Sequence, residues 1–349
     1  MIDTESELAS STFTESGHRF VYNFGVLAHE AAQKLKPELR WKKAVRQFWK
    51  SRFKTIKEME LNSVMLLELE RDNLFNSIEW AHRNLEWKMV CQIVDDLATY
   101  FNIRSYWSEW VHFAELAVGD AELVQDGKLK AIALNNLSVV YRQLDRLPES
   151  IQCCQESIML CQQNGDHYGK ALSLGNLGGS YFAQNDFDAS HESYTAAIEI
   201  FKTLKESYEQ AQSLMGIGIV LAKQQKLDEA SSYLNECLKM QRKLGDRFGE
   251  AQTLNNLGIT QRMQKRFDLS IKSFQKSLLI KEEIGDQQGM ANSLTNLAMS
   301  YERSGQINFA VNTLEKTLAL LRYNNPSDVE RVVRRLEKLR LQQNEKNQA

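Results

Sequence analysis

The chain has 349 residues, with 43 Lys and Arg against 45 Asp and Glu, and its 43% of hydrophobic residues excludes wholesale disorder. Only three prolines occur and none lies between 149 and 325, which argues against the two or three turn-rich domains that the length suggests. No run of about 20 apolar residues and no N-terminal secretory signal is visible. The sequence therefore predicts a soluble, mostly helical, cytoplasmic protein.

The first part of the chain, residues 1–90, divides into a tail and a helical region. Residues 1–16 are rich in Ser, Thr and Glu without an apolar period, so they predict a flexible acidic tail. The segments His18–Leu35 and Leu66–Arg83 carry apolar residues at helical spacing. Residues 17–90 are therefore expected to form an N-terminal helical region.

A basic segment, residues 34–57, lies within this region. It holds ten basic residues and one acidic residue, so it carries +9 and the rest of the chain carries −11. Trp41, Phe48 and Trp49 interleave with the basic residues, and such an amphipathic helix can bind nucleic acid or an anionic membrane. We favour an interpretation in which the aromatics pack on the first repeat and the charges face water. An acidic partner, including the remainder of another copy with its charge of −11, is a further alternative, as is a homo-oligomer joined through the N-terminal helices. The residues of this basic patch are Lys42, Lys43, Arg46, Lys50, Arg52 and Lys54.

From residue 91 onward the sequence matches itself at a shift of forty residues. One apolar column reads Val94, Leu134, Leu174, Leu214, Leu254 and Leu294, and a second reads Leu97, Leu137, Leu177, Ile217, Leu257 and Leu297. A third column holds the small residues Ala98, Ser138, Gly178, Gly218, Gly258 and Ala298. The spacing of the columns is that of an amphipathic helix, and the small residues allow a second helix to approach closely.

Signals for helix ends separate the repeated units. Gly165, Gly245 and Gly285 are each followed by Asp, so that glycine ends one helix in a left-handed conformation and the carboxylate caps the next. Phe267–Glu283 and Ile307–Leu321 are expected to be second helices of their units. Each unit is then a helical hairpin that buries its apolar face only against its neighbours, which predicts a solenoid.

At these columns the sequence resembles the tetratricopeptide-repeat (TPR) family, in the longer-period form of kinesin light chains and bacterial peptide-responsive regulators. The resemblance implies an all-α, right-handed superhelical solenoid between an N-terminal helical extension and a C-terminal capping helix. Gln261, Trp110 and Lys205 depart from the family pattern, where an aromatic, a small residue and a linker glycine are usual. Residues 91–323 are expected to form six units, at about 91–130, 131–170, 171–210, 211–250, 251–290 and 291–323, followed by a capping helix and a basic polar tail at 324–349.

A second, shorter resemblance concerns the region just before the repeats. The runs Glu70–Leu74 and Glu79–Ala81 are similar to a junction in STAND-type signalling ATPases, where it precedes helical sensor repeats. No GxxxxGK[ST] phosphate-binding motif occurs in the sequence. The chain therefore resembles the sensor half of such a protein without its nucleotide-binding half.

The candidate ligand-binding residues follow the forty-residue period. Asn136, Asn176, Asn256 and Asn296 share one column. The TPR resemblance puts this column at the edge of the concave groove, where an amide can pair with the backbone of an extended peptide; the alternative is that it satisfies a carbonyl of the adjacent repeat. Arg142 and Arg262 share a neighbouring column, and either a ligand carboxylate or an intramolecular partner can take their guanidinium groups. The full groove set is Asn135, Asn136, Arg142, Asn176, Gln212, Gln252, Asn255, Asn256, Arg262, Asn292, Asn296 and Arg303.

No motif indicates catalysis, a metal or a cofactor. The six histidines are scattered, the five cysteines lack CxxC spacing, and Cys154 and Cys237 fall near core positions of second helices. We therefore expect no enzyme activity. The sequence predicts a non-catalytic scaffold that binds an extended peptide or protein segment in the concave TPR groove. The alternative is a ligand- or peptide-responsive regulator in signalling or transcription control, with nucleic-acid or membrane contact through residues 34–57.

Overall fold

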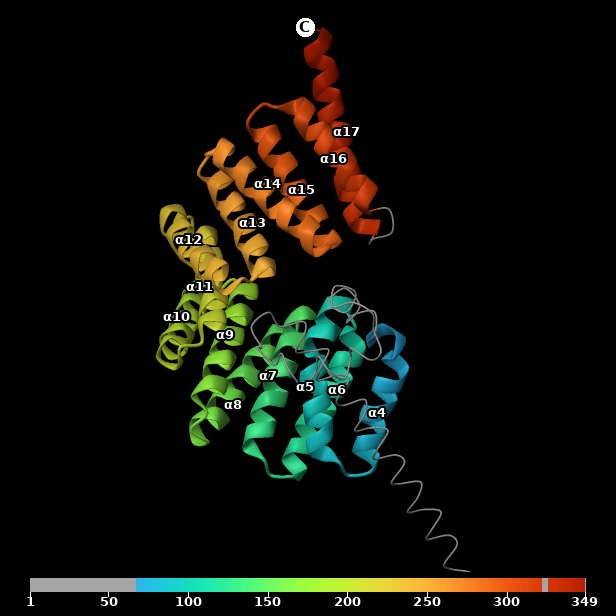
Figure 1. The fold of residues 1–349 in the computed structure, drawn as a ribbon, viewed down its shortest axis with the longest axis vertical. Coiled ribbons are helices and arrows are strands. Elements are labelled where there is room, and N and C mark those ends of the chain that lie inside the picture. The colour runs from blue at the N-terminus through green and yellow to red at the C-terminus, as the bar shows by residue number, and fades with distance from the viewer. Residues whose placement is uncertain (1–66, 322–325, 349) are drawn as a thin grey trace, which may run out of the picture. The chain divides into compact units, whose positions relative to one another are not determined.

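A computed structural model describes residues 67–321 and 326–348 (Figure 1). Within these residues it contains the fourteen helices α4 to α17, a further helical stretch at 67–69, and no strand. The helices are α4 (Arg71–Arg83), α5 (Trp87–Arg104), α6 (Trp107–Leu123), α7 (Gly127–Gln143), α8 (Leu147–Gln163), α9 (His167–Ala183), α10 (Phe187–Leu204), α11 (Ser207–Lys223), α12 (Leu227–Leu244), α13 (Arg247–Met263), α14 (Phe267–Ile284), α15 (Gln287–Arg303), α16 (Ile307–Leu321) and α17 (Pro326–Gln348). This is the all-α repeat fold that the sequence predicts. The predicted acidic tail and the basic segment lie outside the described residues.

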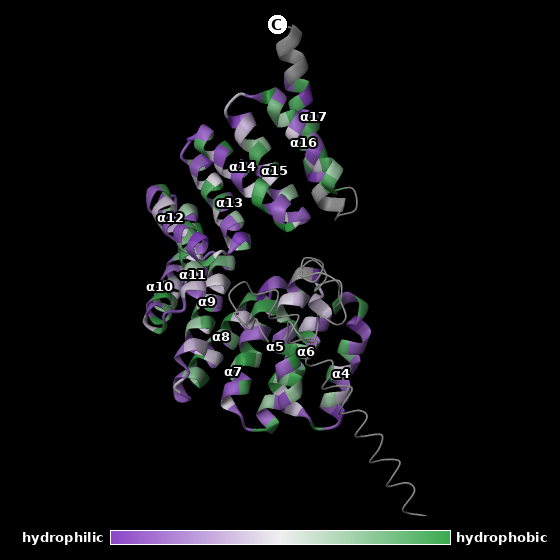
Figure 2. Ribbon diagram, in the orientation of Figure 1, coloured by the Kyte–Doolittle hydropathy of each residue, from purple (hydrophilic) through white to green (hydrophobic). Residues whose placement is uncertain are grey.

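The helices from α5 to α16 form six consecutive pairs, and we call the first helix of each pair its A helix and the second its B helix. The chain divides into two compact bodies, an N-terminal body ending at Ile200 and a C-terminal body beginning at Phe201, which are described separately. Apolar residues recur along each helix between polar ones, as the hydropathy colouring of Figure 2 shows. Each helix therefore has an apolar face to bury against its neighbours.

One left-handed residue marks every turn between successive helices from α4 to α16. These positive-φ residues recur at twenty-residue intervals: Leu85, Ser105, Gln125, Asp145, Gly165, Asn185, Lys205, Gln225, Gly245, Lys265, Gly285 and Gly305. Lys205, which replaces the expected linker glycine, takes the same conformation, with a φ of 63° against 73° for Gly245 and Gly285. The departure at Lys205 therefore keeps the turn, at the steric cost that a Cβ brings to this conformation.

Aspartates cap the A helices as expected. The side chains of Asp166, Asp246 and Asp286 each accept a hydrogen bond from the amide three residues on, and Asp126 accepts from two amides. Glu206 occupies the same position before α11 without a side-chain capping bond. The predicted cap is therefore confirmed for Asp and not for the longer Glu side chain, which follows the general preference at this position.

The column of small residues is where the two helices of a hairpin meet. A Cβ atom on Gly258 would lie 2.8 Å from Cε1 of Phe274, and one on Gly218 would lie 2.6 Å from Cγ of Leu234. Both distances are shorter than van der Waals contact, so these glycines are required by the approach of the B helix. The expectation of close packing at this column is confirmed.

Buried hydroxyls join the helices along the same seam. Ser150 Oγ donates to the Ser138 carbonyl at 2.7 Å and lies 2.8 Å from Ser180 Oγ. Forty-residue symmetry repeats this pattern at Ser270, which donates to the Gly258 carbonyl at 2.7 Å and lies 2.8 Å from Ser300 Oγ. Ser150 and Ser270 thus each donate to a backbone carbonyl of their own helix pair and contact a hydroxyl of the next pair. The polar groups buried between these helices are therefore hydrogen-bonded.

Aromatic side chains fill the core of the N-terminal body. Trp110 is 2% exposed and stacks on Phe101, with ring centroids 6.0 Å apart and an angle of 16° between the rings. Phe75 of α4 stacks on Phe101 and also contacts Phe113. Trp110, which replaces the usual small residue, is therefore accommodated because α4 and the first repeat build an aromatic cluster around it.

Helix α17 covers the last hairpin of the C-terminal body. Val332, Leu336 and Leu339 are buried on it and pack in one cluster with Leu314 and Leu321 of α16. The polar side of α17 is tied down as well, because Arg335 donates to Glu302 of α15 and Arg340 to Glu315 of α16. Helix α17 therefore buries its apolar face against α16, as a capping helix does.

Candidate functional site

The predicted asparagines of the N-terminal body bond to one another across neighbouring A helices. Asn176 Nδ2 of α9 donates to Asn135 Oδ1 of α7 at 2.8 Å, and Asn136 Nδ2 of α7 donates to Asp95 Oδ1 of α5 at 2.9 Å. Both bonds join residues 41 positions apart, so they form a repeating series that we call the amide ladder (Asp95, Asn135, Asn136 and Asn176). All three amide side chains are half-buried, so the ladder retains a face that a ligand can reach.

Arg142, in the last turn of α7, lies against the backbone of α9. A Cβ atom on Gly179 would lie 2.4 Å from Arg142 Nη1 and 3.4 Å from Tyr194 Oη, so the absence of a side chain at Gly179 makes room for the guanidinium. Burial raises the pKa of the Tyr194 hydroxyl, and the Arg142 charge acts in the opposite direction. The phenol therefore stays neutral at physiological pH and does not balance the charge of Arg142.

The Arg142 guanidinium lacks a counter-charge within the described residues. Its Nε is buried without a hydrogen-bond partner, and no ion pair joins Arg142 to a described carboxylate. The neighbouring Arg146, by contrast, pairs with Glu149 at 3.0 Å and lies 4.1 Å from the Tyr141 ring centroid. Arg142 is thus a half-buried cation whose electrostatic requirement is unmet, whereas Arg146 is satisfied.

Gly175 opens the surface beside Arg142 and the amide ladder. It lies inside α9 in the column of Asn135, and a Cβ atom built on it would meet nothing within 4 Å. Internal packing therefore does not require glycine here, although glycine costs a helix interior about 1 kcal/mol relative to alanine. The open space at this half-buried backbone leaves room for a ligand to approach closely.

In the C-terminal body the same columns have other partners. Arg262 Nη1 donates to the Asn296 carbonyl at 2.9 Å and lies 3.4 Å from Asn296 Oδ1. Asn255 Oδ1 accepts from Ser293 Oγ at 3.2 Å, and Ser293 also accepts from the buried Lys281, whose pKa is lowered by burial. The Asn256 side chain makes no hydrogen bond to a described residue, Gln212 and Gln252 are half-buried, and Asn292 and Arg303 are exposed.

The structure therefore assembles the predicted set as two groups. Asn135, Asn136, Arg142 and Asn176 come together on α7 and α9, and the remaining eight residues lie on α11, α13 and α15. The intramolecular bonds at Asn136, Asn176 and Asn296 show that these side chains contribute to repeat stacking, although their partners are the side chains of Asp95, Asn135 and Arg262 and not the backbone carbonyl that the structural alternative named. The basic patch lies outside the described residues.

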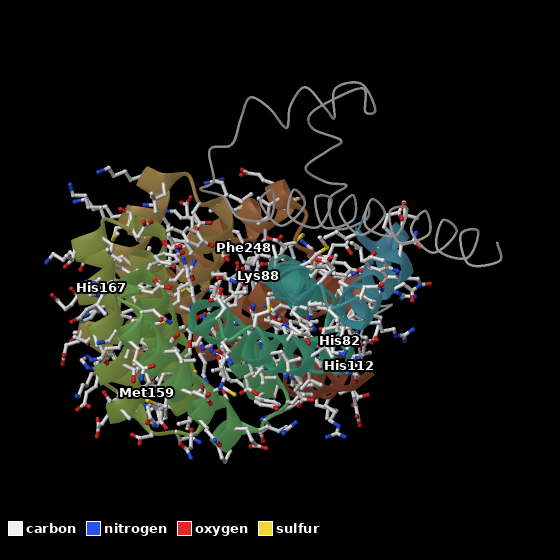
Figure 3. All side chains as sticks on the ribbon, turned by 90° about the horizontal axis from the view of Figure 1, so that it is seen from below. His82, Lys88, His112, Met159, His167 and Phe248 are labelled. Atoms are coloured by element: carbon white, nitrogen blue, oxygen red, sulfur yellow. The ribbon has the colours of Figure 1, made fainter. Side chains whose placement is uncertain are left out.

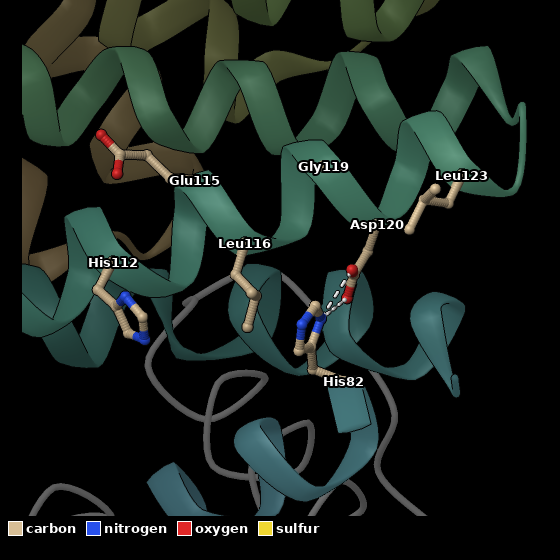
Figure 4. A pocket seen from close by; sticks show the side chains of 7 residues that line it. All are labelled: His82, His112, Glu115, Leu116, Gly119, Asp120 and Leu123. Carbon is tan, nitrogen blue, oxygen red and sulfur yellow. Dashed lines mark hydrogen bonds and ion pairs between the residues drawn. The ribbon is translucent and has the colours of Figure 1, made fainter. Parts of the chain in front are cut away.

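A wide hollow of about 500 Å³ between α4 and α6 escaped the sequence analysis (Figure 4). His82 Nδ1 of α4 lies 2.8 Å and 3.1 Å from the two carboxylate oxygens of the buried Asp120, and His112 Nε2 lies 2.9 Å from Glu79. Burial raises the pKa of Asp120, and the hydrogen bond from His82 opposes that rise. Both imidazoles therefore fasten α4 to α6. No sequence signal could have found this pairing, because α4 precedes the forty-residue register.

Exposed aromatic and sulfur-bearing side chains were also missed. Phe248, at the start of α13, is 49% exposed, and Met159 on α8 is 55% exposed (Figure 3). Large side chains of this kind supply much of the energy at protein interfaces. The signal was available, because the column of Phe248 also holds Tyr168 and Tyr208 in the first turns of α9 and α11.

Other chemistry finds little support in the described part of the chain. All five cysteines are buried there, and burial raises the pKa of the Cys91 and Cys153 thiols to about 12 and of Cys154 and Cys237 to about 11. Such thiols stay protonated and are poor nucleophiles. The described residues contain no group of three His, Cys, Asp or Glu side chains that could hold a metal. None of the described helices is long and apolar enough to cross a membrane.

Comparison with known proteins gives both a family match and structural neighbours. The family model for the tetratricopeptide repeat matches residues 129–203, 209–283 and 250–322, which together exceed half of the chain. The chain is 29% identical over 104 residues to the 43 kDa receptor-associated protein of the synapse from Gallus gallus, and this match spans 28% of the chain but only 24% of that protein.

Two solved structures have a similar fold along almost the whole chain. The Rap protein complexed with Competence and Sporulation Factor has a TM-score of 0.59 at 14% identity, covering 95% of this chain and 99% of that one. A STAND protein with a tetratricopeptide-repeat sensor from Pyrococcus horikoshii has a TM-score of 0.53 at 12% identity, covering 95% of this chain and 64% of that one. At such identities the likeness concerns the fold alone. The matched repeats and the consecutive helix pairs show that the chain belongs to the tetratricopeptide-repeat family.

Proposed function

We propose that this protein is a non-catalytic scaffold that binds an extended peptide or protein segment on the A helices α7 and α9. The observation that carries the proposal is Arg142, a half-buried guanidinium that no described carboxylate neutralises. Partly desolvated cations are stabilised when an anion completes their hydrogen bonding, and a planar guanidinium suits a carboxylate. An acidic side chain or a terminal carboxylate of a peptide supplies such a group.

The surroundings of Arg142 suit a peptide backbone. Asn135, Asn136 and Asn176 offer amide donors and acceptors at half-buried positions, and Gly175 leaves the helix surface open next to them. A preformed array of helices binds at little ordering cost to itself. The amides are engaged with one another in the free protein, so a bound backbone would exchange ladder bonds for its own rather than add bonds to idle groups.

A selection experiment tests this proposal. The full chain is used to enrich peptides from a random dodecapeptide library displayed on phage, and the affinities of the enriched peptides are measured by isothermal titration. We expect peptides that carry an acidic residue and bind Arg142→Gln about tenfold more weakly than the parent chain. Arg146→Gln is the matched control, because Arg146 lies four residues on, just before α8, and already pairs with Glu149. Equal affinity for the parent chain and Arg142→Gln would reject the site.

A regulatory role is the second candidate, and one observation favours it. The Rap structure, which matches 95% of this chain, contains a bound Competence and Sporulation Factor. A ligand-responsive regulator changes shape when its ligand binds, because a ligand shifts the conformational equilibrium by its differential affinity for the two states. Small-angle scattering with the enriched peptides should then show compaction of the protein. An unchanged scattering profile at saturating peptide would reject the regulatory role and leave the scaffold proposal unaffected. Contact with nucleic acid or membranes through residues 34–57 remains a separate hypothesis.

A further inference from the structure

Two polar side chains are buried without a complete set of partners where α12 meets α13. Gln241, in the last turn of α12, is fully buried, and neither its amide nitrogen nor its amide oxygen is hydrogen-bonded to a described residue. Asp246 caps α13 and is 1% exposed. Its Oδ1 accepts from the Gly249 amide at 2.9 Å, but its Oδ2 has no partner in the described part of the chain. Buried polar groups are costly unless another group completes their hydrogen bonds.

The two side chains converge on one spot. A Cβ atom on Gly249 would lie 2.1 Å from Asp246 Oδ2 and 2.5 Å from Gln241 Nε2, so both atoms lie beside the Gly249 α-carbon. A half-turn of the amide, which no hydrogen bond to a described residue opposes, puts the oxygen of Gln241 at the same place. Any side chain at position 249 would fill this spot, so glycine is required there.

The negative charge of Asp246 is not balanced by the neighbouring described residues. Glu250 is buried beside it, and its two oxygens accept from Arg242 and Arg247 at 2.8 Å each. Arg247 also pairs with Glu283. Two guanidinium groups therefore serve three carboxylates, and no ion pair joins Asp246 to a described residue. One negative charge remains at a buried position, which is unfavourable without a cation.

The next repeat shows which kind of group completes this arrangement. Lys281 takes the place of Gln241 there, forty residues on. Its ammonium group donates to the carbonyl of Gly289 at 3.0 Å and to the hydroxyl of Ser293 at 2.9 Å, and the charge of the capping Asp286 favours the charged form. A buried cation is therefore bound at this place in the repeat that follows α13.

The acceptors that hold the Lys281 ammonium recur one repeat earlier. The residues that correspond to Gly289 and Ser293 are Gly249 and Thr253, and Thr253 is fully buried. Among the described side chains, the Thr253 hydroxyl contacts only sulfur atoms, which are weak partners. Its oxygen is thus able to accept or coordinate a further group.

We propose that Gln241, Asp246, Gly249 and Thr253 bind a monovalent cation of the size of K⁺, and we call these residues the cation site. They offer one amide oxygen, one carboxylate, one backbone carbonyl and one hydroxyl, and a single carboxylate balances one positive charge. A water molecule would complete the hydrogen bonds but would leave the charge of Asp246 unbalanced. The cation takes the role that the Lys281 ammonium has in the next repeat. The inference is independent of the peptide site on α7 and α9.

Thermal unfolding of the full chain in two salts tests the cation site. Circular dichroism at pH 7 follows unfolding in potassium chloride and in choline chloride at equal ionic strength. We expect K⁺ to raise the melting temperature by about 2–4 °C, because an ion that binds only the folded state stabilises it. In choline chloride Asp246 keeps its unpaired oxygen. Equal melting temperatures of the parent chain in the two salts would overturn the inference and favour an ordered water.

Variants of the site locate the response to K⁺. Asp246→Asn and Gln241→Leu should each remove the difference between the two salts. Asp286→Asn, the same change in the cap of α15, is the matched control and should leave the difference as it is in the parent chain. Each variant is compared with itself in two salts, so a general loss of stability does not obscure the result.

Exchanging the side chains of the two repeats gives the sharpest test. Gln241→Lys supplies a tethered ammonium group, so it should raise the melting temperature in choline chloride and abolish the response to K⁺. Lys281→Gln makes the converse change and should increase the response about twofold, because the chain then has two cation sites. A response to K⁺ that persists in Gln241→Lys would reject the site, since the ion would then bind elsewhere.

Discussion

The side-chain amide nitrogen of Asn176 donates a hydrogen bond to the side-chain oxygen of Asn135, 2.8 Å away on the neighbouring A helix. The same geometry joins Asn136 to Asp95 one repeat earlier. A column of asparagines that suggests ligand binding in the sequence is therefore also a set of contacts between repeats. The two roles are compatible, but a substitution in this column affects stability as well as binding.

A double-mutant cycle measures the contact between Asn176 and Asn135. We expect Asn176→Ala and Asn135→Ala each to lower the unfolding free energy by about 1 kcal/mol, and the double variant to lose less than the sum by roughly 0.5–1 kcal/mol. Urea unfolding followed by circular dichroism provides the values. The exposed Asn292 is the control, and Asn292→Ala should change stability by less than about 0.5 kcal/mol. Strictly additive losses would mean that the two amides do not interact in solution.

Two glycine-to-alanine substitutions should have opposite effects. Gly258→Ala puts a methyl group 2.8 Å from the ring of Phe274, so we expect a loss of about 1–3 kcal/mol from overpacking. Gly175→Ala meets no atom within 4 Å and should gain up to about 1 kcal/mol from helix propensity. Thermal melts of both variants test the packing. A destabilised Gly175→Ala would contradict the open surface on α9.

Lys205 offers a test of backbone strain at the turns. Its φ of 63° lies in the left-handed region, which a Cβ atom disfavours. Replacing it by glycine should stabilise the protein by roughly 0.5–1 kcal/mol, since the relief of strain exceeds the entropy that glycine adds to the unfolded chain. The reverse change at Gly245, Gly245→Ala, should cost about 1 kcal/mol. The pair would fail as a prediction if both substitutions shifted the melting temperature in the same direction.

Asp246 should make stability depend on pH. Its carboxyl is 1% exposed, and burial raises its pKa, with Glu250 acting in the same direction and the hydrogen bond from the Gly249 amide opposing. Because the folded state then holds the proton more tightly than the unfolded state, this group lowers stability as pH rises from about 4, the ordinary pKa of Asp, through the folded pKa. Asp246→Asn keeps a capping oxygen and removes the charge.

We therefore expect Asp246→Asn to stabilise the protein by about 1 kcal/mol at neutral pH, the cost of one buried unpaired acceptor, and to have no effect below about pH 4. Asp286→Asn is the matched control, because Asp286 caps α15 in the same way at a half-buried position. Urea unfolding at pH 4 and pH 7 gives the comparison. A gain at Asp246→Asn that is equal at both pH values would exclude the carboxyl charge as its cause.

The fold was readable from the sequence because the determinants of each helix recur in register. The expected helix Ile307–Leu321 coincides with α16, and Phe267–Glu283 ends one residue before α14 does. Apolar and small columns fix which faces meet, and Gly–Asp pairs mark the ends. At Lys205 the turn forms at the expected position without a glycine, because the flanking helices determine where the chain must reverse direction.

The site was only partly readable, for a physical reason. The forty-residue period puts Asn136 and Asn176 in one column and Asn135 in the column beside it, but their hydrogen bonds join atoms on different helices, and side-chain torsions decide which amide meets which. The packing of the Arg142 guanidinium against Gly179 and the hydrogen bond between His82 and Asp120 also depend on side-chain torsions and on the distance between helices. A periodic sequence pattern specifies which face of a helix is buried, whereas the hydrogen-bond partner of each side chain depends on the distances and torsions between the packed helices.

Helix α17 has a consequence for assembly. In a stack of similar hairpins, the surface that a repeat turns to the next repeat is complementary to the opposite surface of another repeat. An uncovered last repeat can therefore bind the first repeat of a second copy. Val332, Leu336 and Leu339 occupy that face on α16, and the outer side of α17 is charged. Helix α17 therefore prevents end-to-end association of the repeats. A protein cut before Pro326 would expose an apolar surface through which copies can associate end to end.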